Sequence, residues 1–151
     1  MKDENFTRLV KELQRKIDYE EEKTYSKTVI NEYRNPNHFG ILENPDATAK
    51  IKGSCGDTMK FSLKINNGII KKVNFWTDGC GATIAAGNKL CKIILGKKIR
   101  EAHKINNEKL IDALDGLPKE HNHCALLAVE TFHKTIKNYI KLKKINGENL
   151  Q

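Results

Sequence analysis

The apolar positions at the start of the chain recur at helical spacing. Between residues 4 and 23 they follow one another at intervals of three or four, with charged residues in the gaps, which places them along one face of an α-helix. These positions are Phe6, Leu9, Val10, Leu13 and Ile17. A second, shorter helix is expected over residues 26–33, and Pro36 ends it because proline disfavours helical backbone in the preceding residue. A loop then covers residues 35–47.

The pattern changes to alternation in the middle of the chain. Apolar side chains alternate with polar ones from residue 57 to residue 65, which is the period of a strand with one buried face. The turn signal Asn66-Asn67-Gly68 follows, so a return strand over residues 69–77 forms a hairpin. The predicted buried positions are Met59, Phe61, Leu63 and Ile65 on the first strand and Ile69, Val73 and Phe75 on the second. An earlier strand over residues 47–53 completes a three-stranded antiparallel sheet.

Helical spacing returns after residue 81. One helix is expected to end at Gly96, short helical pieces cover residues 99–104 and 108–114, and the longest helix covers residues 123–144. The predicted apolar stripes are Ile84, Leu90, Cys91, Ile94 and Leu95 on the first helix and Leu126, Leu127, Phe132, Ile136 and Ile140 on the longest. Strands followed by helices indicate an α+β fold, a three-stranded antiparallel sheet with helices packed on one face, plus an extra N-terminal helix.

Composition narrows the functional classes. Of the 151 residues, 38% are hydrophobic and 30% are charged, which is typical of one globular domain. No apolar run approaches the ~20 residues of a membrane span, and the first residues lack the apolar core of a secretory signal. We therefore expect a cytoplasmic protein with no membrane partner. The net charge of +8 is scattered rather than clustered beside aromatic residues, so we expect no nucleic-acid partner and attribute the charge to solubility or to an acidic protein partner.

Three of the four cysteines lie at expected element boundaries, where thiols can bind a metal. Cys55 lies between two strands, Cys80 between the last strand and the next helix, and Cys124 at the start of the longest helix. Flanking glycines let the backbone bend tightly beside a bound atom, and a helix N-terminus favours thiolate over thiol. Three thiolates with a carboxylate or an imidazole suit zinc, or iron with sulfide.

The spacing of these cysteines leaves other interpretations open. Separations of 25 and 44 residues do not match a zinc ribbon, and a free cysteine is often simply a small buried apolar residue. We interpret Cys91, on the apolar stripe of its helix, in that way. Asp57 can likewise be a turn residue that bonds its own backbone.

Four short segments resemble the IscU/NifU N-terminal scaffold family, in the same order and at nearly the same separations. They are Tyr33-Arg34-Asn35-Pro36-Asn37-His38-Phe39-Gly40, Cys55-Gly56-Asp57, Asp78-Gly79-Cys80-Gly81-Ala82, and His123-Cys124-Ala125-Leu126-Leu127-Ala128. The resemblance extends from about residue 25 to about residue 139, and the family has the α+β architecture expected above. It implies a scaffold domain over residues 25–145, preceded by an N-terminal helical extension over residues 1–24. The last residues, 146–151, are expected to form a frayed tail because chain termini are often poorly ordered.

The resemblance implies a function that is not enzymatic. Members of the family accept sulfur from a cysteine desulfurase, combine it with iron and pass the resulting cluster to apo-proteins, and many bind zinc in the empty site. We therefore expect a scaffold for an iron–sulfur cluster, first of all of the 2Fe–2S type, that binds iron and also accepts zinc when no cluster is present. The expected partners are a cysteine desulfurase and apo iron–sulfur proteins.

The resemblance also implies the site residues. Cys55, Cys80 and Cys124 correspond to the cluster thiolates, and Asp57 to an aspartate that keeps the cluster labile, since a carboxylate is a harder and weaker partner for iron than a thiolate. His123 resembles a histidine that serves as an alternative ligand. The predicted ligands are therefore Cys55, Asp57, Cys80, His123 and Cys124. Cys124, expected in a flexible and electropositive position, is the predicted persulfide acceptor.

The sequence departs from the family pattern just before the last cysteine. Leu117-Pro118-Lys119-Glu120-His121 stands where Isc-type members carry Leu-Pro-Pro-x-Lys, which argues against chaperone-assisted release of the Isc type. His121 takes the place of the family lysine near the site, so it either influences the metal or proton balance there or is exposed to solvent, and we favour exposure. We also expect His133 to be exposed. His38 and His103 are interpreted as surface or loop residues. The apolar face of the N-terminal helix is expected to pack either on this domain or on a partner.

Two alternative functions remain. A zinc-bound sulfur-transfer partner of a cysteine desulfurase, similar to SufU, shares the fold, but the 44-residue separation of Cys80 from Cys124 leaves no room for the insertion typical of that branch. A structural zinc interaction domain fits less well, because such sites usually close with four Cys or His ligands.

Overall fold

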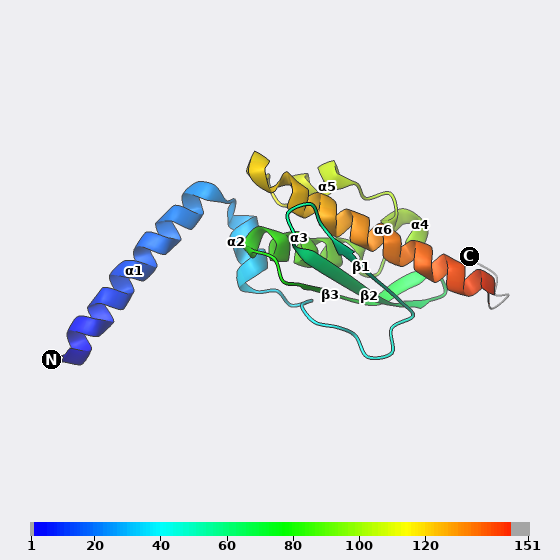
Figure 1. Cartoon of the computed structure of the whole chain (residues 1–151), viewed down its shortest axis with the longest axis horizontal. Helices are drawn as coiled ribbons and strands as arrows, with labels where there is room; N and C mark the ends of the chain where they lie inside the picture. Colours follow the sequence, from blue (N-terminus) through cyan, green and yellow to red (C-terminus); the bar gives the residue numbers. More distant parts are fainter. Residues whose placement is uncertain (1, 146–151) are drawn as a thin grey trace.

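The structure, a computed structural model that describes residues 2–145, has helices at both ends of the chain and a sheet between them (Figure 1). In chain order the elements are α1 (Lys2–Thr24), α2 (Lys27–Arg34), β1 (Ala47–Lys52), β2 (Thr58–Asn66), β3 (Ile69–Thr77), α3 (Gly81–Ile94), α4 (Ile99–Ala102), α5 (Asn107–Ala113), the 3₁₀ turn η1 (Lys119–His121) and α6 (Asn122–Ile145). The predicted α+β class, with its extra N-terminal helix, is confirmed. The tail predicted over residues 146–151 lies outside the described residues.

The three strands form an antiparallel sheet in the order β1-β2-β3, as predicted. Met59, Phe61 and Leu63 of β2 are fully buried, in agreement with their alternation. On β3 one prediction is wrong, because Ile70 is fully buried whereas Ile69 is only half-buried. The register shifts between Lys64 and Ile65, which pairs Ile65 with Ile70. Such a bulge adds one residue to a strand and exchanges the faces of the positions beyond it.

Helices α3 and α6 cover one face of the sheet, with α6 along β1 and β2 and α3 along β3 (Figure 1). The centre of the core is aromatic: the ring centroid of Phe61 lies 6.1 Å from that of Phe132 on α6 and 6.5 Å from that of Phe75 on β3. Two residues that were predicted to lie on the buried stripes of these helices are exposed instead. Leu126 is 43% exposed because its neighbour Leu127 turns inward, and Leu95 is 42% exposed because it caps the end of α3.

A glycine determines how closely α3 approaches the sheet. A Cβ atom added to Gly87 would lie 2.5 Å from Cδ2 of the Phe75 ring, well inside van der Waals contact. The absence of a side chain at this one position therefore lets the helix backbone rest directly on the aromatic ring. Because α3 begins at Gly81, immediately after Cys80, this contact also helps to place Cys80.

Helix α1 extends away from the rest of the chain and is attached mainly at its C-terminal end (Figure 1). Arg34 at the end of α2 forms ion pairs with Asp18 at 2.9 Å and with Glu21 at 2.5 Å. The apolar side chains of α1 are exposed, so of the two expected packing modes the described structure does not show packing on the domain itself. Over residues 2–145, none of the helices is long and apolar enough to cross a membrane.

Replacing Gly87 by Ala is expected to destabilise the protein although alanine favours helices by about 1 kcal/mol over glycine. The clash with Phe75 forces overpacking, which lowers the free energy of unfolding by about 1–3 kcal/mol. Urea unfolding followed by circular dichroism measures the change. In a Phe75→Leu background the same substitution should cost much less, and an equal cost in both backgrounds would show that the ring contact is not responsible.

Candidate metal centre

The three cysteines of interest gather at one end of the sheet, each at the element boundary where it was predicted. Cys55 is exposed in the turn between β1 and β2, Cys80 is the N-cap residue of α3, and Cys124 lies in the first turn of α6. Within residues 2–145, the group whose ligand atoms all lie within 4.8 Å of one another comprises Cys80, His121 and Cys124. We call it the Cys–His–Cys group. Cys55, Asp57 and His123 do not belong to it, although Asp57 and His123 lie beside it.

Two glycine-containing turns bring the sheet and α3 together at this group. The turn that carries Cys55 is closed by the Gly53 amide, which donates to the Asp57 carbonyl at 2.7 Å, and Gly56 adopts a φ of +89° that favours glycine. In the second turn, a Cβ on Gly79 would lie 2.8 Å from Oδ2 of Asp57 and 2.8 Å from Cβ of Thr83. Glycine at position 79 is therefore what allows Asp57 to approach α3.

Thr83, which the sequence did not single out, links the polar groups of the site. Its hydroxyl lies 3.2 Å from Oδ2 of Asp57, 3.3 Å from Sγ of Cys124 and 3.7 Å from Sγ of Cys80. The Thr83 side chain is fully buried. One buried hydroxyl thus lies between a carboxylate and two thiols, and it can donate its proton to any one of them. A Thr on the first turn of an ordinary helix carries no sequence signal for this role.

Cys124 is buried, contrary to the flexible and electropositive position that was expected. Burial raises its pKa to about 11, and the nearby negative charges of Cys80 and Asp57 add to the increase. The hydrogen bond from Thr83 acts in the opposite direction and lowers the pKa. The start of α6 therefore does not make this thiol acidic, and at neutral pH Cys124 is a thiol rather than a thiolate.

His121 takes part in the site, and the prediction that it is exposed to solvent was wrong. It is half-buried, its Nε2 lies 3.1 Å from the hydroxyl of Tyr25, and its Nδ1 lies 4.0 Å from Sγ of Cys124. Tyr25 thus holds one ring nitrogen while the other faces the thiol. Burial raises the pKa of Tyr25, and Cys80 and Cys124 raise it further whenever they are ionised, so the phenol keeps its proton. A partner on the outer nitrogen is what usually orients a metal-binding histidine.

The remaining cysteine and histidines lie apart from the Cys–His–Cys group or at its margin. Nε2 of His123 lies 3.6 Å from Sγ of Cys124. Cys91 is fully buried in the core, as predicted, and burial raises its pKa well above the usual value. His133 was expected to be exposed, but it is half-buried against the Ile105 carbonyl at 3.1 Å, and burial lowers its pKa.

A small α+β domain with a thiol-rich candidate metal site at one end of its sheet is the class that this fold and site define. The family model described as "NifU-like N terminal domain" matches residues 24–146, and the chain belongs to that family. Similarity to curated relatives supports the same family. The chain is 35% identical over 119 residues to the iron–sulfur cluster assembly scaffold protein IscU of Aquifex aeolicus, and the match covers 77% of this chain and 76% of the relative. It is 39% identical over 127 residues to the protein of the same name from Buchnera aphidicola subsp. Acyrthosiphon pisum, which covers 81% and 98%.

Solved structures share the fold. A NifU-like N-terminal protein from Brucella abortus matches with a TM-score of 0.62 at 17% identity, over 77% of this chain and 94% of that one. A putative iron–sulfur cluster assembly scaffold protein for the SUF system from Fervidobacterium islandicum AW-1 matches with a TM-score of 0.61 at 22% identity, over 74% and 96%. At these identities the structures show the shared architecture.

The pKa of Cys124 predicts its reactivity. With a pKa of about 11, roughly a thousandth of this thiol is ionised at pH 8, and the thiolate is the reactive form. Iodoacetamide should therefore modify exposed Cys55 much faster than Cys124, and the Cys124 rate should rise about tenfold per pH unit below pH 11. Peptide mass spectrometry at several pH values measures both rates. Thr83→Val should slow Cys124 further by removing the hydrogen bond to its thiolate, and equal rates for Cys55 and Cys124 at pH 7 would contradict the assignment.

Proposed function

We propose that this chain is a scaffold on which an iron–sulfur cluster is assembled from iron and from sulfur supplied by a cysteine desulfurase, and from which the cluster passes to apo-proteins. The observation that carries the proposal is the Cys–His–Cys group, whose ligand atoms lie within 4.8 Å of one another beside the Cys55 turn. Membership of the NifU-like N-terminal family, together with relatives named as cluster assembly scaffold proteins, supports it.

The donor atoms suit iron and sulfide. Thiolates are the usual ligands of iron–sulfur clusters, and imidazole replaces thiolate in some of them. We assign the thiolates to Cys80 and Cys124 of the Cys–His–Cys group and to Cys55, which is exposed in the neighbouring turn. The imidazole comes from His121 or, as the sequence predicted, from His123. The same donors suit tetrahedral zinc in the cluster-free form.

The division of the site into exposed and buried ligands fits a protein that gives its cluster away. Cys55 and Cys80 are exposed, whereas Cys124 is fully buried. A bound cluster would therefore be held from below by Cys124 and remain open to an acceptor's thiols on the other side. Asp57, held beside Thr83, is a weak partner for iron in place of a fourth thiolate, and this favours release.

Loading requires that Cys124 lose its proton, since only the thiolate binds metal or attacks sulfur. His123 Nε2, 3.6 Å from Sγ, is placed to take that proton, and Thr83 is placed to stabilise the thiolate left behind. In the persulfide step that we propose for Cys124, this thiolate attacks the terminal sulfur of the donor's persulfide, and the donor's cysteine leaves as a thiolate. Because the pKa of Cys124 is raised, this attack requires a base that removes the thiol proton.

The proposal extends to the organisation of the chain and to its surroundings. Residues 25–145 form the scaffold domain and residues 1–24 an extension to it, in keeping with a family match that begins at residue 24. The four free cysteines suit a reducing compartment, so we place the protein in the cytoplasm. The role is that of a carrier of its cluster rather than that of an enzyme.

Anaerobic reconstitution with ferrous iron, cysteine and a cysteine desulfurase tests the function. We expect sulfide-to-iron charge-transfer absorption, with iron and sulfide in equal amounts by chemical analysis. The absorption should be lost in the Cys55→Ala, Cys80→Ala and Cys124→Ala proteins. It should remain in Cys91→Ala, the matched control, because Cys91 lies in the core away from the site. A colourless protein holding one tight zinc under the same conditions would overturn the scaffold proposal in favour of zinc-dependent sulfur transfer.

Zinc affinity distinguishes the two candidate imidazole ligands. His121 belongs to the Cys–His–Cys group and is oriented by Tyr25, so His121→Ala should weaken zinc binding strongly. Tyr25→Phe removes only the orienting hydroxyl and should weaken zinc binding by about 10-fold. His123 lies outside the Cys–His–Cys group, so His123→Ala should weaken zinc binding much less than His121→Ala does. Competition with a chromophoric chelator measures all three, and a loss confined to His123→Ala would return the ligand role to His123.

A further inference from the structure

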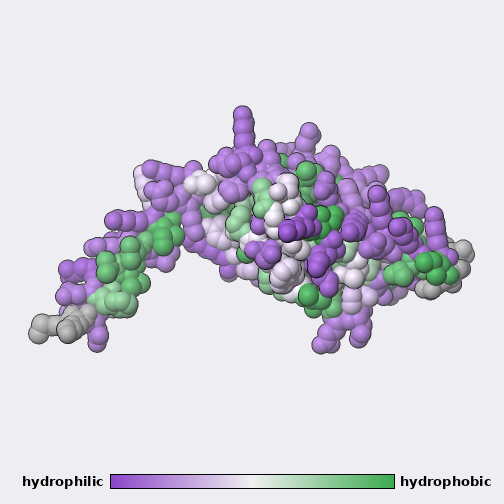
Figure 2. Space-filling model, viewed as in Figure 1, coloured by the Kyte–Doolittle hydropathy of each residue, from purple (hydrophilic) through white to green (hydrophobic). Residues whose placement is uncertain are grey.

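Helix α1 exposes a continuous apolar stripe. Phe6 is 68% exposed, Leu9 53%, Val10 46%, Leu13 51% and Ile17 51%. Figure 2 shows the stripe as a band of hydrophobic surface along the projecting helix, bordered by hydrophilic residues. In proteins, most helical stability comes from packing of an amphipathic helix through its apolar face. The stripe therefore needs a covering surface that the described chain does not supply.

The spacing of the stripe matches the seam of a two-stranded coiled coil. Phe6, Val10, Leu13 and Ile17 follow one another at intervals of four, three and four residues, which are the d, a, d and a positions of two heptads. The a positions are the β-branched Val10 and Ile17, and d is Leu13 in the centre. Among parallel coiled coils, β-branched residues at a with leucine at d favour two strands over three or four.

The flanking charges agree with a parallel pair of identical helices. In the same register Lys16 is a g position and Glu21 is the e position five residues later, which are the positions that meet across a parallel dimer. Two copies would thus form two Lys16–Glu21 ion pairs. Glu21 is held in place by Arg34 at 2.5 Å. An antiparallel pair would not bring these g and e positions together.

The charge of α1 argues against a membrane surface as the occupant. Helices that lie on anionic lipid carry a polar face rich in Lys and Arg. The acidic residues of α1 are Asp3, Glu4, Glu12, Asp18, Glu20, Glu21 and Glu22, and its basic residues are Lys2, Arg8, Lys11, Arg15, Lys16 and Lys23. Acidic residues thus outnumber basic ones, and they dominate the C-terminal part of the helix.

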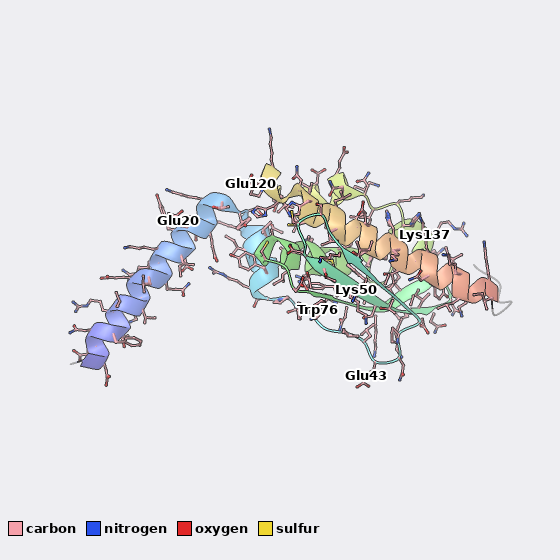
Figure 3. The ribbon with its side chains drawn as sticks, in the orientation of Figure 1. Glu20, Glu43, Lys50, Trp76, Glu120 and Lys137 are labelled. Atoms are coloured by element: carbon pink, nitrogen blue, oxygen red, sulfur yellow. The ribbon has the colours of Figure 1, made fainter. Side chains whose placement is uncertain are left out.

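We propose that the stripe of α1 is covered by the same helix of a second copy of this chain, in a parallel two-stranded coiled coil. Asp3 and Glu20 occupy the next a and d positions and limit the seam to two heptads, so association is weak and reversible. A parallel arrangement brings the C-terminal ends of both helices together. Glu20, near the end of α1, and Glu120, just before His121, lie toward the same end of the domain (Figure 3), so the two metal centres would lie near the same end of the coil.

Sedimentation equilibrium of the full-length chain, from low micromolar to near-millimolar concentration, tests the association. The average mass should rise with concentration toward that of a dimer. Leu13→Glu should keep the protein monomeric across the range. Asn5→Glu is the matched control, since it adds the same charge to the same helix at a c position, outside the a/d seam, and it should associate as the parent does. Both positions are exposed, so neither substitution threatens the domain.

The orientation of the helices is tested separately by disulfide trapping. In a full-length chain that carries Cys55→Ser and Cys80→Ser, Val10→Cys should form a disulfide-linked dimer on mild oxidation, because a positions face each other only in the parallel coil. Asn5→Cys should not. A parent protein that stays monomeric at every concentration would overturn the proposal, and so would an associating protein in which Val10→Cys fails to cross-link. Co-sedimentation of the monomer with vesicles containing phosphatidylserine would instead assign the stripe to a membrane.

Discussion

The close approach of one helix to the sheet is the constraint on which the candidate metal centre depends. Gly87 lets α3 rest on the ring of Phe75, and Gly79 lets the preceding turn come within reach of Asp57. With α3 fixed in this way, Thr83 lies where a carboxylate and two thiols converge. The Thr83 hydroxyl lies within reach of all three groups only because neither glycine carries a side chain that would hold the elements apart.

The second layer of the site comes from the ends of α6 and α1. Cys124 enters from the first turn of α6, and its burial keeps it protonated until a metal or a base intervenes. His121, one turn earlier, is oriented by a hydrogen bond with Tyr25, which lies near the start of the sequence. The result is a centre with one deeply placed thiol and two accessible ones. This asymmetry distinguishes a carrier, which must release what it binds, from a structural zinc site closed on all sides.

Elements with a clear period were predictable from the sequence, and contacts between distant elements were not. The strands and the long helices appear where alternation and helical spacing placed them, and the cysteines lie at the expected boundaries. The bulge that buries Ile70 depends on the register of two strands, which alternation within one strand does not contain. The environments of His121 and Cys124 depend on Tyr25 and Thr83, about 96 and 41 residues away in the chain. A helix start alone suggested an acidic, accessible thiol, and burial outweighed it.

Tyr25 follows directly after the last residue of α1, and its hydroxyl is hydrogen-bonded to the imidazole of His121. One residue therefore connects the projecting helix to the candidate metal centre. Two sites whose occupancy changes the position of the same residue are thermodynamically linked, and the coupling free energy is the same in both directions. If a metal at His121 changes the position of Tyr25, it changes the angle at which α1 leaves the domain. Whatever binds α1 then alters, by the same factor, the affinity of the centre for its metal. The N-terminal arm would in that case report the loading state of the domain to its surroundings.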